Sequence, residues 1–137
     1  MSGGDPVLRV LCVDDHHDAA DTLGVLLELA GYEPRVCYDG FSALAAAEDF
    51  RPDAAILDLS MPGMNGDELG RRLRQTDWGR TLPLVALTAL GGEDARARTT
   101  AAGFDLHLVK PVNPDRLANV LADIVILKAE ADQVAES

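Results

Sequence analysis

The chain has 137 residues, of which 47% are hydrophobic and 26% charged, and its formal net charge is −11. This size suits one domain with a sizeable core, and the acidic balance argues against nucleic-acid binding, which depends on Lys and Arg contacts to phosphates. No apolar run reaches the ~20 residues that a membrane-spanning helix needs, and residues 1–6 lack the features of a signal peptide, which favours the cytoplasm.

Short apolar runs alternate with stretches of helical periodicity along the chain. In the first half, strands and helices alternate in the order 7–13, 18–30, 35–38 and 41–49. In the first helix Ala20, Leu23 and Leu27 recur at helical spacing. Gly31 then supplies the stop that a helix of this length needs.

The second half continues the alternation after a loop at 60–66 that is rich in Pro, Gly and Met. Strands are predicted at 54–57, 84–88 and 106–109, and helices up to about residue 75, at 93–102 and at 115–128. Residues 129–137 either extend the last helix or fray. We therefore expect a single domain over 1–137 with its core at about 7–128. Residues 1–6 would form a flexible tail, as would 129–137 if they do not extend the helix.

Five strands alternating with five helices predict an α/β fold, a doubly wound parallel sheet covered on both faces. The strands are nearly continuous apolar runs, as burial on both faces requires. We expect the strand order 2-1-3-4-5, which makes the first and third strands neighbours where the order reverses.

Polar residues follow four of these strands. Asp14 and Asp15 follow the first strand, Asp58 the third, Thr88 ends the fourth and Lys110 follows the fifth. Ligands of open parallel sheets bind beyond the carboxyl ends of the strands, so these side chains should converge. Each alone has an ordinary explanation as a turn, a helix cap or a surface loop. Their presence together at one sheet edge is better explained as a site.

Three carboxylates in one cleft raise one another's pKa unless a cation lies between them. Mg²⁺ suits such a site because it needs only one or two carboxylates and a phosphate oxygen. With the ion bound, an aspartate oxygen becomes a nucleophile toward a phosphoryl group, and Lys110 can balance charge on the transferred oxygens. The pattern predicts Mg²⁺ as the cofactor of a phosphoryl-accepting aspartate.

The cysteines and histidines predict no further site. Cys12 and Cys37 lie in apolar runs and are expected to be buried thiols. His16, His17 and His107 have no spacing that resembles a zinc motif.

Four segments resemble the response regulator receiver family of two-component signalling: 10–15 (Val-Leu-Cys-Val-Asp-Asp), 57–66 (Leu-Asp-Leu-Ser-Met-Pro-Gly-Met-Asn-Gly), 86–89 (Ala-Leu-Thr-Ala) and 110–112 (Lys-Pro-Val). The resemblance covers nearly the whole chain and implies a flavodoxin-like fold. It implies that Asp58 is the phosphoacceptor. It also implies that Asp15 and Asp58 ligate magnesium directly, Asp14 through water, and Ser60 through its backbone carbonyl.

The resemblance also implies a switch. Lys110 would pair with Asp58 and later with the phosphoryl group, toward which Thr88 would move. Ala89 would leave access to Asp58 open, and the bond from Lys110 to Pro111 is expected to be cis.

One position departs from the common family pattern. His107 replaces the Tyr or Phe that often lies three residues before the lysine, and histidine can make the same inward movement. With Ala-Ala-Asp at 19–21, this resembles receivers of hybrid histidine kinases more than those of transcription factors. Ser60 and Leu90 would flank the path of the hydrolytic water, and we expect them to give slow dephosphorylation.

The sequence thus predicts a free-standing or kinase-linked receiver that accepts phosphate from a histidine kinase or a histidine phosphotransfer protein. It would not be an enzyme beyond its own phosphorylation and dephosphorylation. It would act on an unknown output protein, not on nucleic acid or membrane. It would be a monomer or a weak dimer through the face of the fourth helix, fifth strand and fifth helix. The alternatives are a dedicated phosphohydrolase, which needs a further base and a substrate pocket, and a phosphate-independent binding module.

Overall fold

Five parallel strands form one sheet in the order β2-β1-β3-β4-β5, as predicted. The computed structural model describes residues 7–89 and 93–136, with 93–96 and 134–136 described by their backbone alone. The strands are β1 (Arg9–Val13), β2 (Glu33–Cys37), β3 (Ala54–Asp58), β4 (Leu84–Thr88) and β5 (Leu106–Val109). The helices are α1 (His17–Leu29), α2 (Gly40–Phe50), α3 (Gly66–Arg74), α4 (Glu93–Ala101) and α5 (Pro114–Glu136).

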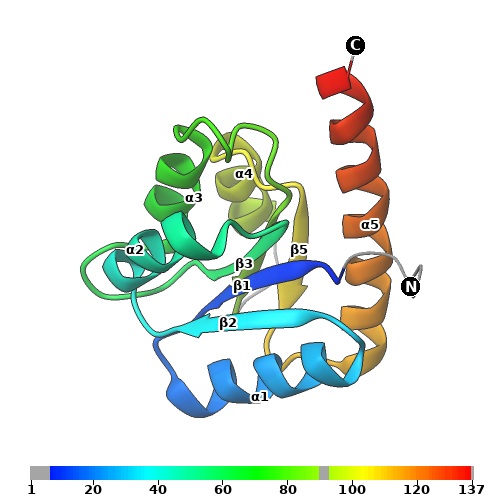
Figure 1. Cartoon of the computed structure of the whole chain (residues 1–137). Helices are drawn as coiled ribbons and strands as arrows, with labels where there is room; N and C mark the ends of the chain where they lie inside the picture. Colours follow the sequence, from blue (N-terminus) through cyan, green and yellow to red (C-terminus); the bar gives the residue numbers. More distant parts are fainter. Residues whose placement is uncertain (1–6, 90–92, 137) are drawn as a thin grey trace.

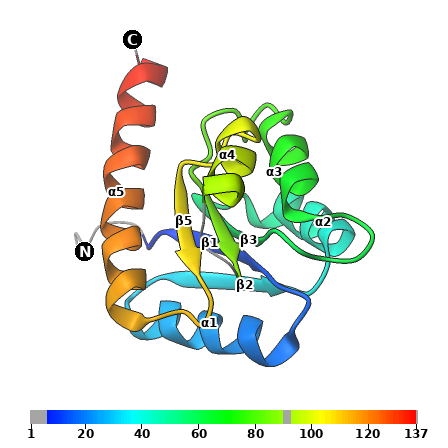
Figure 2. The same cartoon turned by 180° about the vertical axis from the view of Figure 1, so that it is seen from behind.

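Helices cover both faces of the sheet. In Figures 1 and 2, α1 and α5 lie on one face, and α2, α3 and α4 lie on the other. Successive residues of a strand point to opposite faces, so β3 supplies Ala55 and Leu57 to the core under α2 and α3. It supplies Ala54 and Ile56 to the core under α1 and α5. This two-sided burial explains why the central strands are almost uniformly apolar.

The ends of the elements follow local chemistry. Strand β2 begins at Glu33 and includes Pro34, which the predicted strand at 35–38 left out. β2 is an edge strand, where a residue without an N–H is tolerated. Gly31, whose φ is +94°, follows α1 at the predicted stop.

Helix α5 is longer than the predicted helix at 115–128. It begins at Pro114, a residue favoured in the first helical turn, and runs through Glu136. The alternative that residues after 128 extend the helix is the one observed, since residues 129–136 are rich in good helix formers. The last turns of α5 project past the rest of the molecule (Figure 1). Residues 1–6 and Ser137, which the sequence assigned to tails, lie outside the described residues.

Both cysteines are buried free thiols, as predicted. Cys12 and Cys37 belong to the cores on opposite faces of the sheet. Burial, with a smaller effect from Cys37, raises the pKa of the Cys12 thiol far above its ordinary value, which makes it unreactive at neutral pH. Among the described residues, no helix combines the length and apolar composition required to span a bilayer.

Candidate functional site

The predicted site residues come together at the carboxyl edge of the sheet. β1 and β3 are neighbours with Val13 opposite Leu57, so Asp14 and Asp58 come next to each other in the following register position. Asp14 is 1% exposed and Asp58 is 2% exposed. Burying two carboxylates side by side is unfavourable without compensating partners, and the site supplies those partners from the backbone and from β5.

Each buried aspartate is fixed by the turn that follows it. The backbone N–H of His16 donates to Asp14 Oδ1 at 3.0 Å, and that of Ser60 donates to Asp58 Oδ1 at 3.1 Å. The chain returns close to Asp58 at Gly66, where a Cβ atom would lie 2.3 Å from the Asp58 backbone oxygen. Only glycine fits this approach, which places the start of α3 against the end of β3.

Lys110 provides the positive charge of the site. Its Nζ lies 3.0 Å from Asp14 Oδ2 and 3.1 Å from Asp58 Oδ2. The backbone N–H of Lys110 donates to the Thr88 carbonyl at 2.8 Å, which extends the β4–β5 pairing into the loop. The bond from Lys110 to Pro111 is cis, as expected. The pairing of Lys110 with Asp58 matches the arrangement that the resemblance implied for the unphosphorylated domain.

The surroundings of the two buried carboxyl groups shift their pKa values in opposite directions. Burial, together with the neighbouring Asp14, raises the pKa of Asp58 to about 6. Burial acts on Asp14 in the same direction, but the His16 backbone N–H and the Lys110 ammonium outweigh it and lower the pKa of Asp14. Burial opposes the charge of Lys110 as well, but the two carboxylates raise its pKa above the ordinary value. Asp14 therefore holds the negative charge, and Asp58 takes up the first proton.

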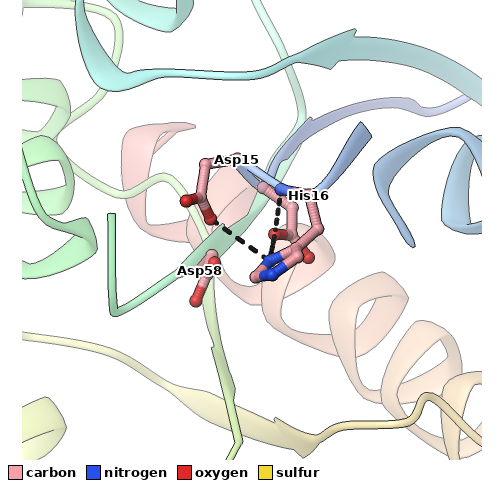
Figure 3. A group of neighbouring side chains, drawn as sticks. Asp15, His16 and Asp58 are labelled. Atoms are coloured by element: carbon pink, nitrogen blue, oxygen red, sulfur yellow. Dashed lines mark hydrogen bonds and ion pairs between the residues drawn. The ribbon is translucent and has the colours of Figure 1, made fainter. Parts of the chain in front are cut away.

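Asp15 and His16 complete a cluster of possible metal ligands. In Figure 3 the imidazole of His16 lies beside the carboxylate of Asp15, with Asp58 below them. One ligand atom from each of Asp14, Asp15, His16 and Asp58 lies within 4.8 Å of the others. Asp15 Oδ1 and Asp14 Oδ2 are buried oxygens that accept no hydrogen bond, although Lys110 Nζ lies near the latter. Oxygens of this kind suit a hard divalent cation, so the residues fit Mg²⁺.

The other predicted residues take different positions. Thr88 is buried at the end of β4, Ala89 is exposed beside it, and Ser60 is exposed with its backbone N–H on Asp58. His107 is partly buried on β5, and its Nε2 forms a hydrogen bond with the hydroxyl of Thr99, a fully buried residue of α4. Leu90 lies outside the described residues.

Sequence reasoning missed His16 and the Thr99–His107 contact. The histidines have no spacing that resembles a zinc motif, and His16 joins the cluster because it directly follows Asp14 and Asp15. That adjacency was the available signal. The contact between Thr99 and His107 had no such signal, because the sequence does not show which side chains of α4 and β5 face each other.

Comparison with known proteins gives a consistent result. The family model for the response regulator receiver domain matches residues 10–122. The phosphate regulon transcriptional regulatory protein PhoB of Pseudomonas aeruginosa is 33% identical over 92% of this chain and 55% of its own length. The chain spans about half the length of several curated relatives that it matches.

Solved structures share the fold. The chemotaxis protein CheY4 of Vibrio cholerae superimposes with a TM-score of 0.83 at 33% identity, over 87% of this chain and 99% of that one. The receiver domain of a signal transduction histidine kinase from Syntrophus aciditrophicus gives a TM-score of 0.77 at 30% identity, over 90% and 92% of the two chains.

The match to the family model covers most of the chain, and its relatives are regulators of two-component systems. Receiver domains are regulatory switches that work with histidine kinases or phosphotransfer proteins. The chain therefore belongs to the response regulator receiver domain family.

Proposed function

We propose that this receiver accepts a phosphoryl group on Asp58 from a phosphohistidine of a kinase or a phosphotransfer protein, in a reaction that requires Mg²⁺. The observation that carries the proposal is the buried Asp14–Asp58 pair with Lys110 Nζ at 3.0 and 3.1 Å. A lysine shared by two buried carboxylates at a strand edge has little value for stability alone, because both charges must lose their hydration. The same lysine is useful where the site must accept a phosphoryl group, because its positive charge can balance the added negative charge.

In the transfer, a carboxylate oxygen of Asp58 attacks the phosphorus of the donor. The phosphorus–nitrogen bond breaks, an acyl phosphate forms on Asp58, and the released imidazole takes a proton from solvent. Lys110 can move from its two carboxylates to the new phosphoryl oxygens, since its ammonium has three donors.

Asp14, Asp15, Asp58 and the Ser60 carbonyl would hold the metal ion. The ion would supply charge neutralisation for the nucleophile and for the phosphoryl oxygens. The chain's own contribution is to keep these oxygens in place before the ion arrives. The turns at His16 and Ser60 do this for Asp14 and Asp58 through backbone N–H groups at 3.0 and 3.1 Å.

Phosphorylation would be read out through α4 and β5. We propose that Thr88 moves toward the phosphoryl group and that His107 then moves into the space beside β4. His107 must leave or change its hydrogen bond to Thr99, so β5 and α4 are coupled. The face formed by α4, β5 and α5 would thus differ between the two states, which is the requirement for a ligand-driven population shift. The output partner would bind there, or a second copy of the chain would do so weakly.

The test is phosphorylation with a small acyl phosphate or a phosphorylated phosphotransfer protein, followed by intact-mass measurement. Wild-type protein should gain one base-labile phosphoryl group in Mg²⁺ and none in excess EDTA. Asp58→Asn should gain none, because an amide is not the required nucleophile.

The matched control is Asp39→Asn. Asp39 is another aspartate that follows a strand, but it caps α2 by accepting from the Ser42 N–H at 2.7 Å. Asparagine caps helices as well as aspartate does, so this variant should be labelled like the wild type. Labelling of Asp58→Asn, or labelling that survives EDTA, would refute the proposal.

A further inference from the structure

His16 has a side chain that its own helix does not use. It occupies the N-cap position of α1, where Ser, Thr, Asp or Asn normally accept a hydrogen bond from the first turn, yet it makes no such cap. Its ring instead turns to the acidic cluster, with Nδ1 3.5 Å from Asp15 Oδ1 and 3.6 Å from Asp14 Oδ1 (Figure 3).

These separations are close to those of neighbouring ligands on one ion. Metal–ligand bonds of about 2.1 Å at right angles put adjacent ligand atoms about 3 Å apart. The cluster also contains a buried oxygen that lacks a hydrogen-bond donor, Asp15 Oδ1. It is the carboxylate oxygen nearest to the imidazole of His16, at 3.5 Å from Nδ1. Asp14, which is 1% exposed, is instead paired through Oδ2 with Lys110 Nζ at 3.0 Å.

We propose that His16 is a nitrogen ligand of the metal site, so that the site prefers a divalent first-row transition ion to Mg²⁺. This inference rests on the proposed function of the same site. Imidazole suits Co²⁺, Ni²⁺ and Zn²⁺, whereas Mg²⁺ takes oxygen ligands. Carboxylate oxygens alone already favour the transition ions, and one imidazole increases this preference, because Mg²⁺ binds nitrogen weakly. The His16 side chain is 75% exposed, so an ion held there remains open to water and to a phosphoryl oxygen.

The neighbouring histidine supplies a matched control. His17 begins α1 but stacks on Tyr38, with ring centroids 3.8 Å apart and planes inclined by 14°. Its side chain is therefore engaged with the edge strand and is not part of the acidic cluster. His16→Asn and His17→Asn remove one imidazole each from adjacent exposed positions.

The experiment measures Co²⁺ and Mg²⁺ binding by titration calorimetry, with the visible absorption spectrum of bound Co²⁺ as a second readout. His16→Asn should lower the Co²⁺ affinity at least about tenfold, since even outer partners of metal ligands contribute that much. It should leave the Mg²⁺ affinity unchanged and alter the Co²⁺ spectrum. His17→Asn should match the wild type in its Co²⁺ affinity, its Mg²⁺ affinity and its Co²⁺ spectrum.

Asp15→Asn separates this inference from the proposed function. If Asp15→Asn abolishes Mg²⁺ binding but His16→Asn leaves Co²⁺ binding and its spectrum unchanged, His16 is only a charge partner of the carboxylates and the inference is wrong. A rise in affinity for both ions in His16→Asn would have the same meaning. If Asp15→Asn changes neither the Co²⁺ affinity nor the Mg²⁺ affinity, the acidic cluster is not the metal site and the proposed function fails as well.

Discussion

Replacing Asp58 by Asn should stabilise the metal-free protein at neutral pH. The pKa of Asp58 is about 6 in the folded chain, against 3.8 for an ordinary aspartate. A group whose pKa is raised on folding supports the folded state fully below its unfolded pKa, and this support is lost as the pH rises toward its folded pKa. For Asp58 the loss falls between about pH 4 and pH 6, so at pH 7.5 the ionised side chain opposes folding. Asparagine removes that opposition.

The size of the effect follows from the same values. A rise from 3.8 to about 6 corresponds to at most about 3 kcal/mol. Two effects make the real gain smaller than this limit: solvent screens the charges of the site, and the variant loses the ion pair between Asp58 and Lys110. We therefore expect the unfolding free energy of Asp58→Asn to exceed that of the wild type by on the order of 1–2 kcal/mol. At pH 5 the gain should be about half of that at pH 7.5.

The assay is urea unfolding in EDTA at pH 7.5 and pH 5, followed by circular dichroism. Asp123→Asn, on the exposed side of α5, is the control and should change stability little at either pH. Excess Mg²⁺ should reduce the difference in unfolding free energy between Asp58→Asn and the wild type, because binding of the ion stabilises the wild type. A loss of stability in Asp58→Asn at pH 7.5, or an equal gain at both pH values, would refute the electrostatic explanation.

Three further predictions concern the switch, the core and the lifetime of the signal. Lys110→Ala should still be phosphorylated but should lack the wild-type change in near-ultraviolet circular dichroism, because the contact that reports the phosphoryl charge is gone; a wild-type spectral change would mean that Lys110 is structural only. Ile56→Ala should lower the unfolding free energy in urea by about 2–5 kcal/mol, since Ile56 is fully buried under α1 and α5, and a cost below this range would indicate a core that refills the cavity. A Ser60→Asn, Leu90→Glu double variant should lose phosphate faster than the wild type in a decay measurement, because polar side chains can position the hydrolytic water; equal decay would contradict the slow dephosphorylation expected from Ser60 and Leu90.

The sequence predicted the features that depend on periodicity. The convergence of Asp14, Asp58 and Lys110 follows from apolar runs that end in polar residues, because parallel strands bring equivalent ends to one edge. The strand order is the one that the resemblance to a flavodoxin-like fold implied. Edge effects were harder to predict. The predicted strand at 35–38 begins after Pro34, whereas β2 includes this residue, because an outer strand needs only one set of backbone hydrogen bonds.

Side-chain directions explain most of what the sequence did not reveal. His16 and His17 are indistinguishable as letters, yet one ring lies on the acidic cluster and the other on Tyr38. The hydrogen bond between Thr99 and His107 joins two elements whose contact is decided by packing across the sheet edge. The division of charge between Asp14 and Asp58 likewise depends on which backbone N–H groups reach each carboxylate.

The last turns of α5 fix the direction in which the helix leaves the domain. Lys128 Nζ lies 3.6 Å from Asp53 Oδ1 beside β3 and 3.6 Å from Asp132 Oδ1 one turn later, so the projecting turns are braced against the sheet. A continuous helix rises about 1.5 Å and turns about 100° with each residue. Anything joined rigidly to its end would therefore keep a fixed orientation relative to the acidic edge of the sheet. Inserting one residue after Glu136 would turn a fused reporter by about 100°, whereas inserting a full heptad would nearly restore its orientation. Signal strength in such fusions should vary periodically with linker length instead of falling steadily.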